Sequence, residues 1–229
     1  MKWIFGISNF LIGTCLASHA CVIIERLGKE DFIFSRSKCT NCNQQLCLLD
    51  EIPLISYLIL KGRCRYCKIH IPCEYFLIEF LGGFAFYKID FSSMHDICTA
   101  IVLFSLLLAA ISDYQVQEFD IMLVLPALVI SLQHLMNNFY RINTTDLIEF
   151  LPIFLFFLFE TVRKKCGSGD LIVYLILSFY FNSQFANLTF LTASIALLIV
   201  FLGSKMSKKE PVAFIPFIYI GLIIQLLCK

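Results

Sequence analysis

The stretch Lys164-Lys165-Cys166-Gly167-Ser168-Gly169-Asp170 leads directly into an apolar run from Leu171 to Phe181. It places an acidic side chain at the N-terminal end of an apolar helix that is typical of membrane proteins. Gly167 and Gly169 have no Cβ, so the backbone there can come close to another group. A second acid, Asp113, ends another apolar run. We interpret the rest of the chain as a scaffold that brings the two carboxylates together at one face of a membrane.

The composition excludes an ordinary soluble domain. Of the 229 residues, 59% are hydrophobic and only 15% are charged. A soluble domain of this size is nearer half apolar, so the excess requires a solvent other than water. The sequence therefore predicts an all-α polytopic membrane protein in a lipid bilayer, and we expect no nucleic-acid partner.

Eight apolar runs are candidate transmembrane helices. The first, Trp3 to Ile24, continues past a possible signal-peptide cleavage site, so we expect an uncleaved helix. The run after Asp170 either spans fully or is re-entrant. The chain then divides into a first helix at 1–24, a polar domain at 25–73 and a membrane domain of about seven helices at 74–229. The seven runs of that domain lie at about 74–88, 96–112, 119–135, 146–162, 170–182, 186–203 and 211–228.

The distribution of Lys and Arg predicts the orientation. Cytoplasmic loops of membrane proteins are enriched in these residues. With the N-terminus outside, the loops assigned to the cytoplasm contain every Lys and Arg except Lys2, Lys88, Arg141 and Lys229. The polar domain, Asp113 and Asp170 are then all on the cytoplasmic side.

Two Cys-x-x-Cys pairs stand in the polar domain, at Cys39 and Cys42 and at Cys64 and Cys67. Each pair offers two thiolates, and four thiolates suit a tetrahedral zinc ion. Thiols stay reduced in the cytoplasm, so disulfides are not expected. The alternative is a chance pairing in a cysteine-rich chain. Two such pairs in one polar loop favour a structural zinc site that folds the loop.

Asp113 and Asp170 predict a site for general acid–base catalysis if their carboxyl groups lie close together. Two acids within hydrogen-bond distance cannot both ionise easily, so one serves as general acid and the other as general base for a water molecule. The alternatives are structural, with Asp170 as a helix N-cap and Asp113 as a loop acid. Asp120 and Glu118 compete with Asp113 for the first position. Glu79, inside the second apolar run, requires a buried hydrogen-bond donor.

The sequence resembles the bacterial type IV prepilin peptidases, which are membrane aspartic peptidases of the Gly-x-Gly-Asp type. The resemblance is carried by Gly13–Leu16, Ile24–Leu27, Ser35–Cys42, Glu51–Leu58, Lys61–Cys67 and Gly167–Asp170. It implies that Asp113 and Asp170 are the catalytic acids and that 74–229 is the peptidase domain, with Gly167 and Gly169 as its supporting backbone motif. The family usually has a proline before the aspartate that Asp120 matches, and Val116–Asp120 lacks it, so Asp120 stays open as the first acid.

The resemblance also implies the substrate and the location. Prepilins or pseudopilins would lose their leader at the cytoplasmic face of the bacterial plasma (inner) membrane. Many family members also methylate the new N-terminus with S-adenosylmethionine, an activity linked to the tetracysteine domain. The compact length resembles the competence-type peptidases of Gram-positive bacteria. The alternatives are an intramembrane aspartic peptidase of the presenilin or preflagellin-peptidase kind, and a non-catalytic, zinc-anchored membrane assembly or transport component.

Overall fold

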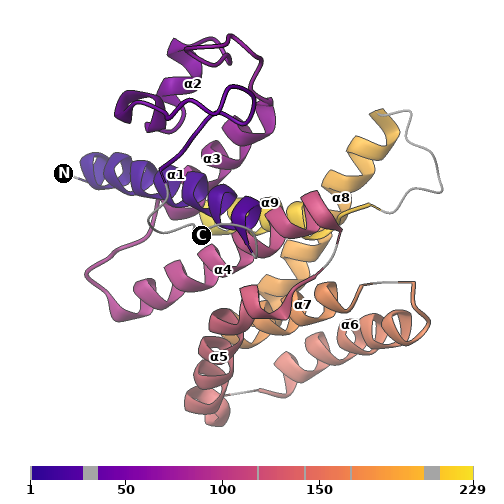
Figure 1. The fold of residues 1–229 in the computed structure, drawn as a ribbon. Helices are drawn as coiled ribbons and strands as arrows, with labels where there is room; N and C mark the ends of the chain where they lie inside the picture. Colours follow the sequence, from indigo (N-terminus) through magenta and orange to yellow (C-terminus); the bar gives the residue numbers. More distant parts are fainter. Residues whose placement is uncertain are drawn as a thin grey trace. The chain divides into compact units, whose positions relative to one another are not determined.

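A computed structural model describes residues 2–27, 36–117, 119–141, 143–165, 167–203 and 212–228. Apart from two isolated β-bridges, all regular structure in these residues is helical (Figure 1). The elements in chain order are α1 (Lys2–Arg26), η1 (Leu48–Glu51), α2 (Ile55–Ile59), α3 (Cys73–Phe86), α4 (Met94–Val116), α5 (Ile121–Asn138), η2 (Phe139–Arg141), α6 (Thr144–Val162), α7 (Ser168–Tyr180), α8 (Ser183–Gly203) and α9 (Ile215–Cys228).

Each of the eight apolar runs coincides with one α-helix, so the all-α prediction is confirmed for the described residues. Four helices are long and apolar enough to cross a membrane: α1, α4, α5 and α8. The helices α7 and α9 are apolar but shorter. The 13 residues of α7 extend over about 20 Å, less than the ~30 Å of a hydrocarbon core. The number of eight spans stays a prediction.

The chain forms two compact units, residues 1–89 and 90–229. In the first unit α1 packs against α3 through small residues. A Cβ added at Gly82 would lie 2.4 Å from the Cβ of Ala17, and one added at Gly13 would lie 2.4 Å from the carbonyl oxygen of Gly82. Small residues of this kind let two helix backbones approach closely, which is how membrane helices associate without a hydrophobic driving force.

In the second unit the helices α4 and α7 bury the most side chains. Helix α4 packs against α5 and α9, while α7 packs against α5, α6 and α8. Tyr174 of α7 is fully buried among aromatic rings, and its hydroxyl donates a hydrogen bond to Oδ1 of Asn187 over 2.9 Å. The middle of α7 is therefore packed against protein on several sides, although the helix is short.

We expect Gly82→Val to weaken the pairing of α1 with α3. The new side chain meets Ala17 on the facing helix, and overpacking of this kind costs about 1–3 kcal/mol. A thermal melt of the purified protein should show a lower Tm. Gly203→Val is the matched control, because a Cβ at Gly203 has nothing within 4 Å. Equal Tm values for the two variants would contradict the close approach.

Candidate functional site

The two Cys-x-x-Cys pairs form two turns of the same design, 25 residues apart. In the first turn the Cys39 N–H donates to the Gln44 carbonyl oxygen over 3.0 Å, and the Asn43 N–H donates to the Cys39 carbonyl oxygen over 2.9 Å. In the second turn the Cys64 N–H donates to Ile69 over 2.9 Å, and the Lys68 N–H donates to Cys64 over 3.1 Å.

The matching positions Asn43 and Lys68 share a left-handed backbone, with φ of 54° and 60°. Each turn is also closed by one antiparallel bridge, Lys38 with Gln45 and Arg63 with His70. The two cysteine pairs are therefore presented by equivalent knuckles.

The four thiols gather at one point. The Sγ atoms of Cys39, Cys42, Cys64 and Cys67 all lie within 4.8 Å of one another, and those of Cys39 and Cys67 are 3.8 Å apart. Four sulfurs at about 2.3 Å from a tetrahedral zinc ion are separated by about 3.8 Å, so the cluster fits that ion. The sequence prediction that these four cysteines lie together is confirmed, and zinc as their ligand remains a proposal.

At two of the four cysteines the knuckles favour the thiolate form that a metal requires. The Ile69 N–H and the Asn41 side chain lower the pKa of Cys67 to about 6. Backbone N–H groups of Cys42 and Asn41 lower the pKa of Cys39. The fold thus stabilises negative charge at Cys39 and Cys67. At Cys42 the Gln44 N–H lowers the pKa, but desolvation and the thiols of Cys39 and Cys67 outweigh it and raise the pKa to about 11.

The polar segment has little apolar core of its own. Between residues 36 and 72 only Gly62 and Cys64 are buried. The segment is also stabilised by an ion pair between Arg65 and Asp50, with N···O distances from 2.6 to 3.0 Å. The sequence analysis did not predict this pair. This contact lowers the pKa of Asp50. A segment with so few buried side chains is expected to depend on a metal for its shape.

We expect the purified protein to contain about one zinc ion per chain, and Cys39→Ser to lose it, because three thiolates and a hydroxyl bind zinc more weakly. Elemental analysis measures both. Cys47→Ser is the matched control, since Cys47 is exposed and lies outside the cluster. Wild-type protein without bound metal would count against the site.

Asp113 is positioned by two helices. It lies half-buried in the last turn of α4, where the helix dipole disfavours negative charge. Its Oδ2 accepts a hydrogen bond of 3.1 Å from the N–H of Ile215, the first residue of α9. The N-terminus of a helix stabilises an anion, so α9 compensates for the unfavourable end of α4. Asp113 is therefore not a free loop acid.

Asp170 lies in the first turn of α7 and is buried, with 9% of its surface exposed. The helix begins at Ser168 and Gly167 occupies the N-cap position. The alternative that Asp170 is the N-cap is therefore wrong, because the helix already starts at Ser168, two residues before Asp170. Its side chain is instead turned into the protein.

A close contact brings the two acids to the same end of the second unit. A Cβ added at Gly169 would lie 2.6 Å from Cδ2 of Phe119, in the connection between α4 and α5. The chain six residues after Asp113 therefore lies against the residue before Asp170. In addition, Leu106, Val173 and Ile215 line one small apolar cavity, which joins the inner faces of α4, α7 and α9.

Asp120 has a different role from Asp113. It is exposed and caps α5, accepting a hydrogen bond of 2.9 Å from the Met122 N–H. This arrangement is an ordinary helix N-cap. Glu118, the other competitor, lies outside the described residues. The geometry therefore favours Asp113 as the partner of Asp170.

The two glycines before Asp170 differ. We expect Gly169→Val to disrupt the start of α7, because the new side chain would overlap the ring of Phe119. We expect Gly167→Ala to be tolerated, since a Cβ there lies 3.7 Å from Oδ2 of Asp170, an ordinary contact, and φ is −68°. Thermal melts of both variants test the difference, and equal losses would contradict it.

Comparisons with known proteins show what the chain is similar to. Residues 11–92 match the family model of the Bacterial Peptidase A24 N-terminal domain. A prepilin leader peptidase/N-methyltransferase of Myxococcus xanthus is 36% identical over 107 residues, which cover 45% of this chain and 32% of that relative. The chain thus spans about a third of that protein.

Two further relatives with the same name align over most of their length. The protein of Vibrio cholerae is 23% identical over 227 residues, covering 90% of this chain and 89% of the relative. The protein of Pseudomonas aeruginosa is 28% identical over 228 residues, covering 83% and 78%. No solved structure matches the chain.

Proposed function

The chain is a relative of the type IV prepilin peptidases, a family of enzymes, as the sequence predicted, and from that premise we propose that it is a membrane aspartic endopeptidase that removes the leader of prepilins or pseudopilins. The proposal rests on one observation above all. The contact of Phe119 with Gly169 brings the loop after Asp113 against the residue before Asp170.

The proposed chemistry needs only the two carboxyl groups and a water molecule. When two carboxyl groups share a site, one keeps a proton and the other does not, and the pair titrates together. The ionised group accepts a proton from the water as its oxygen attacks the scissile carbonyl carbon. The protonated group donates to the departing nitrogen. Burial of Asp170 and the α9 N-terminus at Asp113 hold the two side chains in place for these steps.

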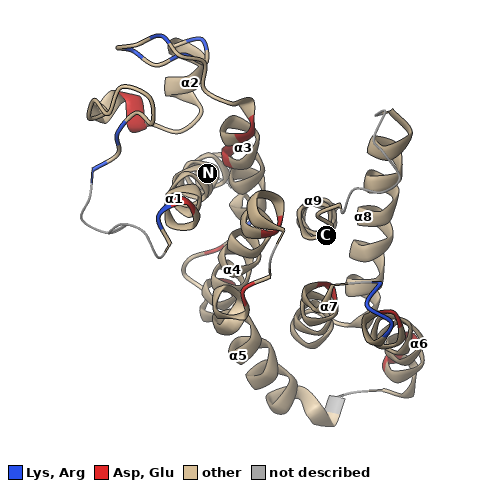
Figure 2. Cartoon of the chain, turned by 45° about the vertical axis from the view of Figure 1, so that its right-hand side comes forward, with Lys and Arg blue, Asp and Glu red and all other residues tan. Residues whose placement is uncertain are grey.

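We further propose that the aspartates face the cytoplasm, with the N-terminus outside and about eight helices in the bacterial plasma (inner) membrane. In the described part of the second unit, the turn after α6 contains three basic residues in a row, Arg163, Lys164 and Lys165, and Figure 2 shows this stretch in blue. This turn leads into α7 and Asp170. Basic residues beside a membrane helix favour the cytoplasmic side, which supports the assignment.

A second activity is proposed from the relatives, whose names include N-methyltransferase. Such an enzyme would transfer a methyl group to the new N-terminus, with S-adenosylmethionine as the donor. The sequence has no glycine-rich nucleotide loop, so the first unit is the candidate location by its resemblance alone. The non-catalytic alternative, a zinc-anchored assembly component, gives no reason for an acid at the buried start of α7.

The peptidase proposal predicts that Asp113→Asn and Asp170→Asn each abolish leader removal, with a loss of at least about 100-fold, because an amide cannot exchange the proton. A pseudopilin co-expressed with each variant reports cleavage as a gel shift. The amide introduced by Asp113→Asn keeps an oxygen that can accept the Ile215 N–H, so this variant should fold.

Asp120→Asn is the control for this experiment, because Asn also caps helices well. It should cleave like the wild type. Cleavage by Asp113→Asn together with loss in Asp120→Asn would transfer the role to Asp120. Cleavage by the double variant of Asp113 and Asp170 would refute the aspartic mechanism.

A further inference from the structure

The short elements η1 and α2 carry large apolar side chains on their outer surface. Ile55, Leu58 and Ile59 recur at the spacing of one helix face, and between 47% and 70% of each residue is exposed. Leu48 and Leu49 of η1, which packs against α2, are exposed to 72% and 65%. This set of five side chains, here called the outer apolar face, lies in the otherwise polar part of the first unit.

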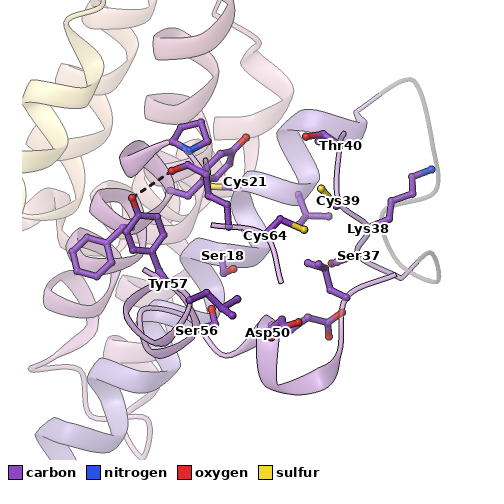
Figure 3. A pocket seen from close by; sticks show the side chains of 18 of the residues that line it. Ser18, Cys21, Ser37, Lys38, Cys39, Thr40, Asp50, Ser56, Tyr57 and Cys64 are labelled. Carbon is purple, nitrogen blue, oxygen red and sulfur yellow. Dashed lines mark hydrogen bonds between the residues drawn. The ribbon is translucent and has the colours of Figure 1, made fainter. Parts of the chain in front are cut away.

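The polar side chains of the same two elements point inward. They line a cavity of about 350 Å³ that α1 and α3 also border, and Figure 3 shows Asp50 of η1 and Ser56 and Tyr57 of α2 around it. The Asp50 side chain, which pairs with Arg65, is only 2% exposed. A segment surrounded by water would turn such groups outward and its leucines inward. The reversed arrangement indicates that the outer apolar face contacts something other than water.

The position of α2 along α1 indicates the depth at which this face lies. The apolar part of α1, Trp3–Arg26, has 24 residues and is about 36 Å long. It is therefore longer than the ~30 Å hydrocarbon core of a bilayer, and its last turns lie at the surface. Cys21 and Glu25 of these turns line the same cavity as Tyr57 of α2. Helix α2 is thus level with the headgroup layer.

Two contacts with α3 fix α2 at this level. The Leu54 N–H, directly before α2, donates a hydrogen bond of 2.8 Å to Glu79 of α3, and this is the donor that the sequence analysis required for Glu79. The rings of Tyr57 and Phe76 are 5.2 Å apart, and Phe76 stacks on Phe80 at 6.2 Å. Phe80 is itself exposed. A row of rings therefore connects α2 with the exposed apolar surface of α3.

The exposed charges beside the outer apolar face are basic. Residues 48–70 contain four Lys or Arg side chains, of which Arg65 is neutralised by Asp50. The other three are exposed and form no ion pair with another described residue: Lys61, Arg63 and Lys68. The second acid of this range, Glu51, lines the cavity. Basic side chains next to an exposed apolar face are typical of elements that bind anionic lipid.

We propose that η1 and α2 form an interfacial anchor that inserts the outer apolar face into the headgroup layer of a bilayer containing anionic phospholipid. Leu58 and Ile59 reach the boundary of the acyl chains, and Lys61, Arg63 and Lys68 contact the phosphates. The anchor holds the tetracysteine segment against the membrane surface. The inference goes beyond the proposed function, since it concerns lipid and depends on neither cleavage nor a bound metal.

The chain has a single tryptophan, so the depth of one side chain can be measured by fluorescence. In a Trp3→Phe background, Leu58→Trp introduces one fluorophore on the outer apolar face, where an exposed position accepts a larger ring. The full-length protein is studied in nanodiscs of phosphatidylcholine and phosphatidylglycerol, with acyl chains brominated near the headgroup or unlabelled. Bromine quenches tryptophan at short range, so brominated lipid should reduce the emission about two-fold or more for a side chain at this boundary.

Gln44→Trp in the same background is the matched control. Gln44 is exposed on the first cysteine knuckle and lies outside the outer apolar face. Its emission should be quenched by acrylamide in the water and hardly by bromine. Ile59→Trp is a second reporter, because it lies on the same face as Leu58 and should be quenched in the same way. If neither reporter is quenched by bromine, or if both are quenched no more than the control, the anchor is refuted.

The charge of the bilayer tests the class of lipid. Quenching of Leu58→Trp should increase when phosphatidylglycerol is added to pure phosphatidylcholine. The triple variant Lys61→Gln, Arg63→Gln and Lys68→Gln should lose this increase, because no unpaired basic side chain remains beside the face. An increase that persists in the triple variant would overturn the assignment to anionic lipid.

A second copy of the chain is the competing occupant of the outer apolar face. It would shift the emission of Leu58→Trp to the blue without bromine quenching, and the shift would grow with the number of chains per nanodisc. That result would overturn the lipid proposal. Quenching by bromine that is independent of the number of chains would support it.

Discussion

The hydrogen bond between Ile215 and Asp113 is the interaction on which the candidate catalytic end depends. It joins residues 102 apart in sequence and places an acid at the junction of two helix ends of opposite polarity. Without the N–H donors at the start of α9, the last turn of α4 would carry a half-buried carboxylate at the unfavourable end of its helix dipole. With this hydrogen bond, the first residue of α9 lies next to the last turn of α4. Leu222 of α9 and Val173 of α7 line a shared apolar pocket, so α7 also packs against α9.

The two units have different sources of stability. The second unit buries long apolar faces of α4 and α7, and its aromatic rings pack around Tyr174. The polar part of the first unit buries almost nothing between residues 36 and 72 and relies on turns, one Arg–Asp pair and the thiol cluster. With the proposed zinc bound, the protein would combine a part that folds by packing with a part that folds by coordination.

The sequence predicted the helices and the cysteine cluster because both depend on local patterns. Apolar runs need helices to satisfy their backbone in lipid, and two Cys-x-x-Cys pairs constrain their own turns. The contacts that place the aspartates were not predictable in this way. Phe119 against Gly169, and Ile215 at Asp113, join segments that no local pattern relates. The same holds for Leu54 at Glu79. Gly167, interpreted as a close approach, has ordinary space around it.

The repeated knuckles have a consequence for the order of folding. Each one is closed by hydrogen bonds between residues at most nine apart, so both can form early and independently. A metal that joins them makes the connection between distant parts of the segment, and the entropic cost of closing such a loop grows only slowly with its length. The arrival of the ion, rather than the completion of the chain, would then set the moment at which the segment acquires its shape.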